Sequence, residues 1–163
     1  RWFEWACYCP VMRLHGDREP HTPALTPGVP GGGQLGSGGP NEIWSYGEAN
    51  YQIMKRYIER RAALKPYIER QMRAAHEQGI PVMRPLFYDF PGDGRAWEVE
   101  DAYMFGDRLL VAPVMEAGAA ERAVYLPAGA RWLEQATGTT YDGGREVRAH
   151  APIDVIPVFE RLD

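Results

Sequence analysis

The residues best suited to chemistry lie near the start of the chain, in the run Cys9–Gly16. If this run is a strand, its side chains alternate between two faces, and Val11, Arg13 and His15 share one of them. A polar pair at the end of an otherwise apolar strand is typical of a (β/α) barrel, in which inward-facing residues at the carboxyl ends of the strands form the active-site floor. An edge strand whose polar face is simply in water is the alternative. Arg13 and His15 are therefore the candidate site residues.

The other potentially reactive residues show no pattern of this kind. The four histidines are scattered and lack metal-ligand spacing. Cys7 and Cys9 are too close for a comfortable disulfide, so we expect reduced, buried thiols. The glycine-rich stretch 27–39 lacks the Lys-Ser/Thr ending of a phosphate-binding loop. We therefore expect neither a metal nor a cofactor.

The composition narrows the class of protein. The 163 residues are 45% hydrophobic and 25% charged, which is close to the average for a globular protein. A net charge of −4 gives no reason to expect nucleic acid or an anionic membrane as a partner, and no apolar run could span a bilayer. The chain begins at Arg1 with aromatic residues of the kind usually buried, which is rare at a natural N-terminus, so we expect a piece of a longer protein. This start shows no series typical of a signal peptide. The sequence decides no compartment, and the cytoplasm is slightly favoured.

The first half of the chain predicts helices around one long loop. A helix over residues 1–6 precedes the run Cys9–Gly16, and a loop extends from Asp17 to Glu42. We expect the uncharged stretch 27–39 within this loop to be mobile, either as a lid or subsite wall or as an insertion without a role.

A long helix should follow the loop. Ser45 and Glu48 fit a capping box, and apolar residues then recur with the helical period as far as Ala75. Pro66 predicts a kink or two abutting helices, and Gly79 with Pro81 ends the pattern. Just before this helix, Trp44 and Tyr46 either stack on a ring of a bound ligand or form a hydrophobic staple, which we favour.

After Gly79 the pattern changes to short apolar runs separated by Gly, Asp and Pro. Strands are predicted near residues 82–88, 108–114, 122–126 and 153–159, with helical turns at 97–104. Such spacing is typical of an antiparallel sandwich, in which Trp97 and Trp132 would lie in the core or at a domain interface. We place a domain boundary here, which gives domains 1–79 and 80–163.

Several blocks, in this order and at this spacing, resemble the carboxyl-terminal part of glycoside hydrolase family 31. Arg1–Glu4 through Arg13–Gly16 resembles the helix and last strand of the family's barrel, and Leu64–Tyr67 resembles its final helix. The opening of the next domain is matched by further blocks, namely Pro81–Leu86, Tyr103–Gly106, Leu109–Val114, Val124–Pro127 with Trp132, and Ile156–Phe159. One departure is Glu4, where the family often has Gln.

The resemblance implies the fold class α/β plus all-β, with the end of a (β/α)8 TIM barrel over residues 1–79 and an antiparallel β-sandwich over residues 80–163. It also implies retaining hydrolysis of terminal α-linked glucose or xylose by two aspartates on earlier strands, expected upstream of Arg1. No catalytic residue is then assigned within this chain, and the fragment alone is expected to be inactive.

Within the chain, the resemblance assigns His15 to hydrogen bonds with the hydroxyls of the bound sugar. Arg13 would balance the charge of the two carboxylates or form a structural ion pair inside the barrel, which we favour. The alternative to an enzyme is a non-catalytic carbohydrate-binding or structural β-sandwich module.

Overall fold

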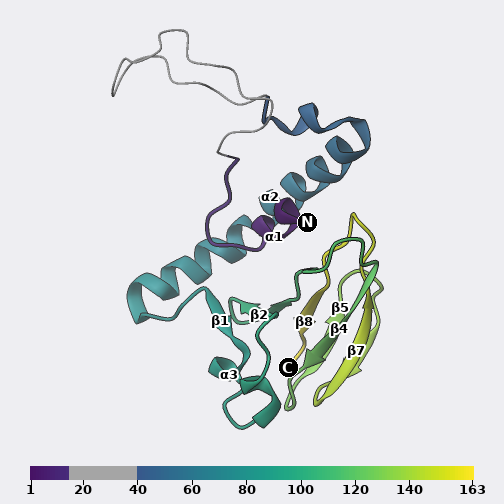
Figure 1. The fold of residues 1–163 in the computed structure, drawn as a ribbon. Coiled ribbons are helices and arrows are strands. Elements are labelled where there is room, and N and C mark those ends of the chain that lie inside the picture. Colours follow the sequence, from purple (N-terminus) through teal and green to yellow (C-terminus); the bar gives the residue numbers. More distant parts are fainter. Residues whose placement is uncertain (15–39) are drawn as a thin grey trace, which may run out of the picture.

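Two of the described helices lie against one side of an antiparallel β-sandwich (Figure 1). The computed structural model describes residues 1–14 and 40–163. His15 and the glycine-rich stretch 27–39 lie outside the described residues. The elements are α1 Trp2–Cys7, a 3-10 helix Ile43–Tyr46, α2 Glu48–Gln78, β1 Met83–Pro85, α3 Leu86–Asp89, a 3-10 helix Gly94–Trp97, β2 Tyr103–Phe105, β3 Leu109–Val111, β4 Glu121–Leu126, β5 Arg131–Glu134, β6 Thr140–Asp142, β7 Arg145–His150 and β8 Val158–Arg161.

The strands form two sheets. The larger sheet has six strands in the order β1-β2-β3-β8-β5-β6, and β4 pairs with β7 in the smaller one. Every pairing is antiparallel, with Leu110 opposite Phe159 and Val124 opposite Val147. The antiparallel sandwich predicted from the spacing of turn signals is confirmed.

Both faces of the larger sheet are buried where β2, β3 and β8 meet. Because side chains alternate along a strand, Leu110 and Phe159 point into a core shared with β4 and β7. Leu109, Val111 and Val158 point the other way, into a second core closed by the helices. That second core includes Cys7 and Tyr8 at the end of α1 and Tyr57 and Ile68 of α2.

The long helix forms as predicted, but it begins differently. Gly47 is its N-cap, at φ 84°, without a side-chain cap. The hydroxyl of Ser45 instead donates to the carbonyls of Pro40 and Glu42, at 2.9 and 2.7 Å, so the predicted capping box is wrong. The helix ends at Gly79, which adopts the left-handed conformation at φ 70° as expected.

The helix continues through Pro66 as a single element, and the prediction of two abutting helices is wrong. Leu64, Tyr67 and Ile68, on both sides of the proline, pack into the second core. This packing favours one helix over the local preference of proline to end it.

Several local predictions differ from the structure. The strand predicted near residues 153–159 begins only at Val158, as β8. The predicted strand over residues 82–88 shortens to β1 because α3 follows directly. Helical turns occur at Gly94–Trp97, and residues 103–105 are the strand β2. The run Cys9–Leu14 is irregular backbone, because no described strand lies beside it to share hydrogen bonds. The barrel part of the predicted fold is therefore not present in this chain.

Candidate functional site

The predicted site residues lie on the segment that leaves the end of α1. Helix α1 stops at Cys7, and the backbone then runs through Pro10 to Leu14 without regular structure. The side chain of Arg13 is exposed near the end of this segment. His15 lies outside the described residues, so its predicted place beside Arg13 stays a prediction.

The start of this segment is fixed by Arg61 of α2. Its Nη1 donates to the carbonyl oxygen of Cys7 at 2.9 Å and also to that of Cys9, while its Nη2 donates to Pro10 at 2.8 Å. The carbonyl of Cys7 is one that the end of a helix leaves without an intrahelical partner, and those of Cys9 and Pro10 belong to the irregular segment that follows. A cation at this end also interacts favourably with the helix dipole.

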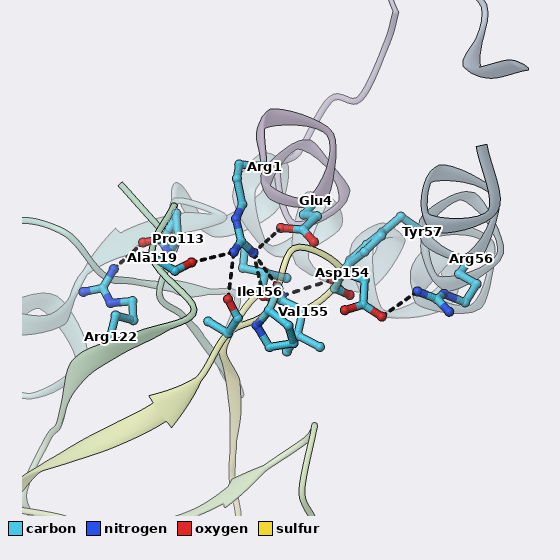
Figure 2. Close-up of polar contacts among 12 residues, drawn as sticks. Arg1, Glu4, Arg56, Tyr57, Pro113, Ala119, Arg122, Asp154, Val155 and Ile156 are labelled. Carbon is cyan, nitrogen blue, oxygen red and sulfur yellow. Dashed lines mark hydrogen bonds and ion pairs between the residues drawn. The ribbon is translucent and has the colours of Figure 1, made fainter. Parts of the chain in front are cut away.

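The other end of α1 is fixed by Arg1, as Figure 2 shows. Its guanidinium donates to four backbone carbonyls of the sandwich loops, at 2.7–3.0 Å, which are those of Ala119, Ala151, Pro152 and Val155. It also pairs with Glu4 at 3.3 Å. The fork of five N–H donors in arginine suits such a set of converging acceptors.

Glu4 is the most buried charged side chain at this junction, with 2% of its surface exposed. Burial raises the pKa of its carboxyl group, and the neighbouring guanidinium of Arg1 acts in the opposite direction. Its Oε1 has no hydrogen-bond partner among the described residues.

Tyr57 connects α2 to the same loop. Its hydroxyl donates to the carbonyl of Asp154 and accepts from the amide of Ile156, both at 3.1 Å. Arg56, one residue earlier, pairs with the Asp154 carboxylate at 2.8 Å (Figure 2). Burial raises the pKa of Tyr57, so the hydroxyl keeps its proton and both roles near neutral pH.

The two cysteines match their prediction as free thiols. Cys7 is fully buried in the second core and Cys9 is half-buried. Burial raises the pKa of Cys7 to about 11, which keeps the thiol protonated and unreactive near neutral pH.

The far half of α2 is held to the sheet through the turn between β2 and β3. The hydroxyl of Tyr67 donates to the carbonyl of Phe105 at 2.6 Å and accepts from the amide of Arg108 at 3.2 Å. Gln71 donates to Asp107 at 2.8 Å. Gly106 lies beneath these side chains at φ 67°, where a Cβ atom would lie 2.7 Å from Gln71 Cδ.

A cavity of about 320 Å³ lies between α1 and the sandwich. Trp2, Trp5 and Tyr103 line it together with apolar residues of the sheet, and Glu100 and Asp101 add carboxylates. This combination of aromatic rings and carboxylates could accept a sugar or an apolar side chain from a neighbouring polypeptide.

The predicted tryptophans have different environments. Trp132 is fully buried in the sandwich core, as predicted, and its indole N–H donates to the carbonyl of Pro127 at 3.1 Å. Trp97 is 56% exposed and stacks on Phe87, so it does not lie in the core, and its position at a domain interface stays a prediction. Trp44 is also exposed, just before α2.

Residues 1–14 and 40–163 contain neither a candidate metal-binding cluster nor a helix that could span a membrane. No group of three His, Cys, Asp or Glu side chains lies close enough to hold a metal ion there. In the same part of the chain, no helix has the length and apolar character needed to cross a membrane.

Comparison with known proteins identifies the family. The family model described as "Glycosyl hydrolase family 31 C-terminal domain" matches residues 79–163, slightly more than half of the chain. The chain belongs to glycosyl hydrolase family 31. The resemblance seen in the ordered sequence blocks is thereby confirmed.

Solved structures of family 31 enzymes extend the match over both helices. A GH31 α-xylosidase from a soil metagenome, crystallised with xylose, is 51% identical and superposes with a TM-score of 0.94 over 99% of this chain and 24% of its own. A xylosidase from Aspergillus niger is 34% identical, with a TM-score of 0.83 over 99% of this chain and 23% of its own.

Curated relatives are much longer than this chain. An α-xylosidase of Saccharolobus solfataricus is 31% identical over 99% of this chain and 19% of its own length. A probable glucan 1,3-α-glucosidase of Arabidopsis thaliana is 32% identical over 99% of this chain and 16% of its own length. The chain therefore spans about a fifth of the curated relatives it matches.

Sequence reasoning missed the residues that hold the junction together, although one signal was available. Arg61 occupies a position on the same helical stripe as Tyr57, Leu64 and Ile68, at spacings of four, three and four residues. A cation on an otherwise apolar stripe indicates a buried acceptor opposite it. Nothing comparable in the sequence shows that Arg1 reaches loops more than one hundred residues away.

Proposed function

We propose that the protein containing this chain is a retaining α-glycosidase that removes terminal α-linked xylose or glucose from oligosaccharides or glycosides. The supporting observation is the 51% identity and TM-score of 0.94 to a family 31 α-xylosidase that was crystallised with xylose. That similarity covers α1 and α2 as well as the sandwich, so the proposal rests on the whole chain.

Retaining hydrolysis needs two carboxyl groups about 5 Å apart, one as nucleophile and one as acid and then base. We assign neither to this chain. Glu4 is buried against Arg1, and Glu48 lies in the first turn of α2, away from Arg13 in sequence. In the proposed enzyme both carboxylates come from another part of the protein.

In the proposed enzyme, the parts of the chain before and after Gly79 have different roles. Residues 1–79 carry α1 and α2, which pack on the sandwich, and residues 80–163 form the sandwich that supports these helices. His15 donates and accepts hydrogen bonds with sugar hydroxyls, as a neutral imidazole can. Arg13 binds substrate, offsets the charge of the two carboxylates, or forms an ion pair with a barrel residue.

The test uses the full-length protein with p-nitrophenyl α-xyloside and α-glucoside. His15→Ala should lower kcat/KM by about 100-fold or more, because a site that hydrogen-bonds a sugar hydroxyl loses that contact in the transition state. His150→Ala is the matched control, since this exposed histidine lies on β7, and it should leave kcat/KM unchanged.

Two results would contradict the proposal. Wild-type activity in His15→Ala would remove this residue from the substrate site. A full-length protein inactive on α-glycosides would favour the carbohydrate-binding alternative, which titration calorimetry of the protein with xylose and glucose would then test.

A further inference from the structure

The segment from Cys7 to Pro10 is held from two sides. On one side the guanidinium of Arg61 binds three of its carbonyls, those of Cys7, Cys9 and Pro10. On the other side, the hydroxyl of Tyr103 in β2 donates to the carbonyl of Tyr8 at 2.9 Å. Four consecutive carbonyls are thus bound by side chains from α2 and the sheet.

These contacts replace the hydrogen bonds that a strand would make. Pro10 has no N–H to offer a neighbouring strand, and the segment forms no ladder with any described residue. Its path is therefore determined by side chains, and Arg61 supplies most of the contacts. Arg13 follows only three residues after the last bound carbonyl.

We propose that Arg61 is a positioning residue of the glycosidase, which fixes the backbone at Cys7–Pro10 that leads to Arg13 in the proposed substrate-binding segment. The inference rests on the proposed function. A lysine at this position would keep the charge but lack the planar fork that reaches separate acceptors at once. A displacement of about 1 Å in a substrate-binding segment can cost about 100-fold in rate.

The experiment compares Arg61→Lys and Arg61→Ala with wild type in the full-length protein. Both variants should lower kcat/KM for the aryl α-glycosides by about 10- to 100-fold. Arg70→Ala is the control, because Arg70 is an exposed arginine of the same helix that pairs with Asp107. It should retain wild-type kcat/KM. Wild-type kcat/KM in Arg61→Lys would overturn the proposal.

A double-mutant cycle separates positioning from general stability. If Arg61 acts through the substrate-binding segment, Arg61→Lys should cost much less in the His15→Ala background than in the wild type. Equal losses in both backgrounds would mean that the two residues act independently, and would overturn the proposal. The same conclusion follows if kcat/KM per folded molecule is unchanged and only the melting temperature falls.

Failure of this inference can be distinguished from failure of the proposed function. A wild-type protein without activity on any α-glycoside tested refutes the enzyme itself. An active wild type that is sensitive to His15→Ala but not to Arg61→Lys refutes only the positioning role.

Discussion

Two arginine side chains hold the opposite ends of α1 through several hydrogen bonds each. Arg1 joins the helix to the sandwich loops, and Arg61 joins its end to α2. Both bind backbone carbonyls rather than relying on carboxylates alone. Carbonyls in irregular segments need a partner when they are buried, and a guanidinium can satisfy several of them at once.

Glu4→Gln tests the electrostatics of this junction. Because burial raises the pKa of the Glu4 carboxyl above that of the unfolded chain, the folded protein holds a proton in the window between the two values that the unfolded chain has released. The stability of the wild type therefore falls as pH rises through this window. Glutamine cannot titrate but still offers an oxygen to Arg1.

The variant should thus gain stability relative to wild type as pH rises above the ordinary pKa of glutamate, as measured by the melting temperature of the chain. Glu59→Gln, which changes an exposed carboxylate of α2, is the control and should show no such trend. A constant difference between Glu4→Gln and wild type at all pH values would contradict the expectation.

At the scale of elements, the turn between β2 and β3 fits tightly beneath α2. Gly106→Ala would place a Cβ atom against Tyr67 and Gln71 in a left-handed backbone. The backbone conformation should cost about 1 kcal/mol, and the overpacking about 1–3 kcal/mol more, in the free energy of unfolding.

Gly118→Ala isolates the first of these costs. Gly118 has φ 78° and nothing within 4 Å of the position that a Cβ atom would take, so only the backbone contribution applies there. Denaturant unfolding of both variants should show Gly106→Ala as the more destabilised. Equal losses would mean that α2 moves freely to make room.

The sequence predicts elements well where their own pattern decides them. The period of apolar residues from Tyr51 to Ala75 indicates α2, and the burial of both faces of Leu109–Val111 agrees with a continuous apolar run. The free, buried thiol of Cys7 also follows from the sequence.

The failures occur where a distant partner decides. Cys9–Leu14 has the alternation of a strand but no neighbouring strand among the described residues, so its first carbonyls bind Arg61 instead. Ser45 has the spacing of a helix cap, but its hydroxyl donates to carbonyls that precede the helix instead. For the candidate site, the sequence indicates Arg13 and His15 but not the contacts that place their segment.

At the scale of the whole molecule, the larger sheet belongs to two cores at once. One face of this sheet packs against β4 and β7, and the other face packs against α1 and α2. Figure 1 shows the two helices together on one side of the sandwich. The predicted domains 1–79 and 80–163 therefore share a core across the boundary near Gly79.

The fragment 79–163 should reveal this dependence. Without the helices, the side chains of Phe105, Leu109, Val111 and Val158 lose their cover. Each contributes about 1.5–3 kcal/mol when buried, a large share of the about 5–15 kcal/mol that stabilises a domain. The fragment should melt at a lower temperature than the chain 1–163 and bind a hydrophobic dye.

A fragment of residues 40–163 keeps α2, so its melting temperature should lie between those of 79–163 and 1–163. If 79–163 melted at the same temperature as the whole chain, the second core would contribute nothing to the stability of the sandwich.

The shared sheet also limits how such proteins can be recombined. A sandwich taken from a relative with other residues on its outer face would arrive with a surface that does not match α1 and α2. Chimeric proteins joined at Gly79 would then have poorly matched packing in the core that includes Cys7 and Tyr8. Exchanges that begin before α1 would carry helices and sheet together and preserve their fit.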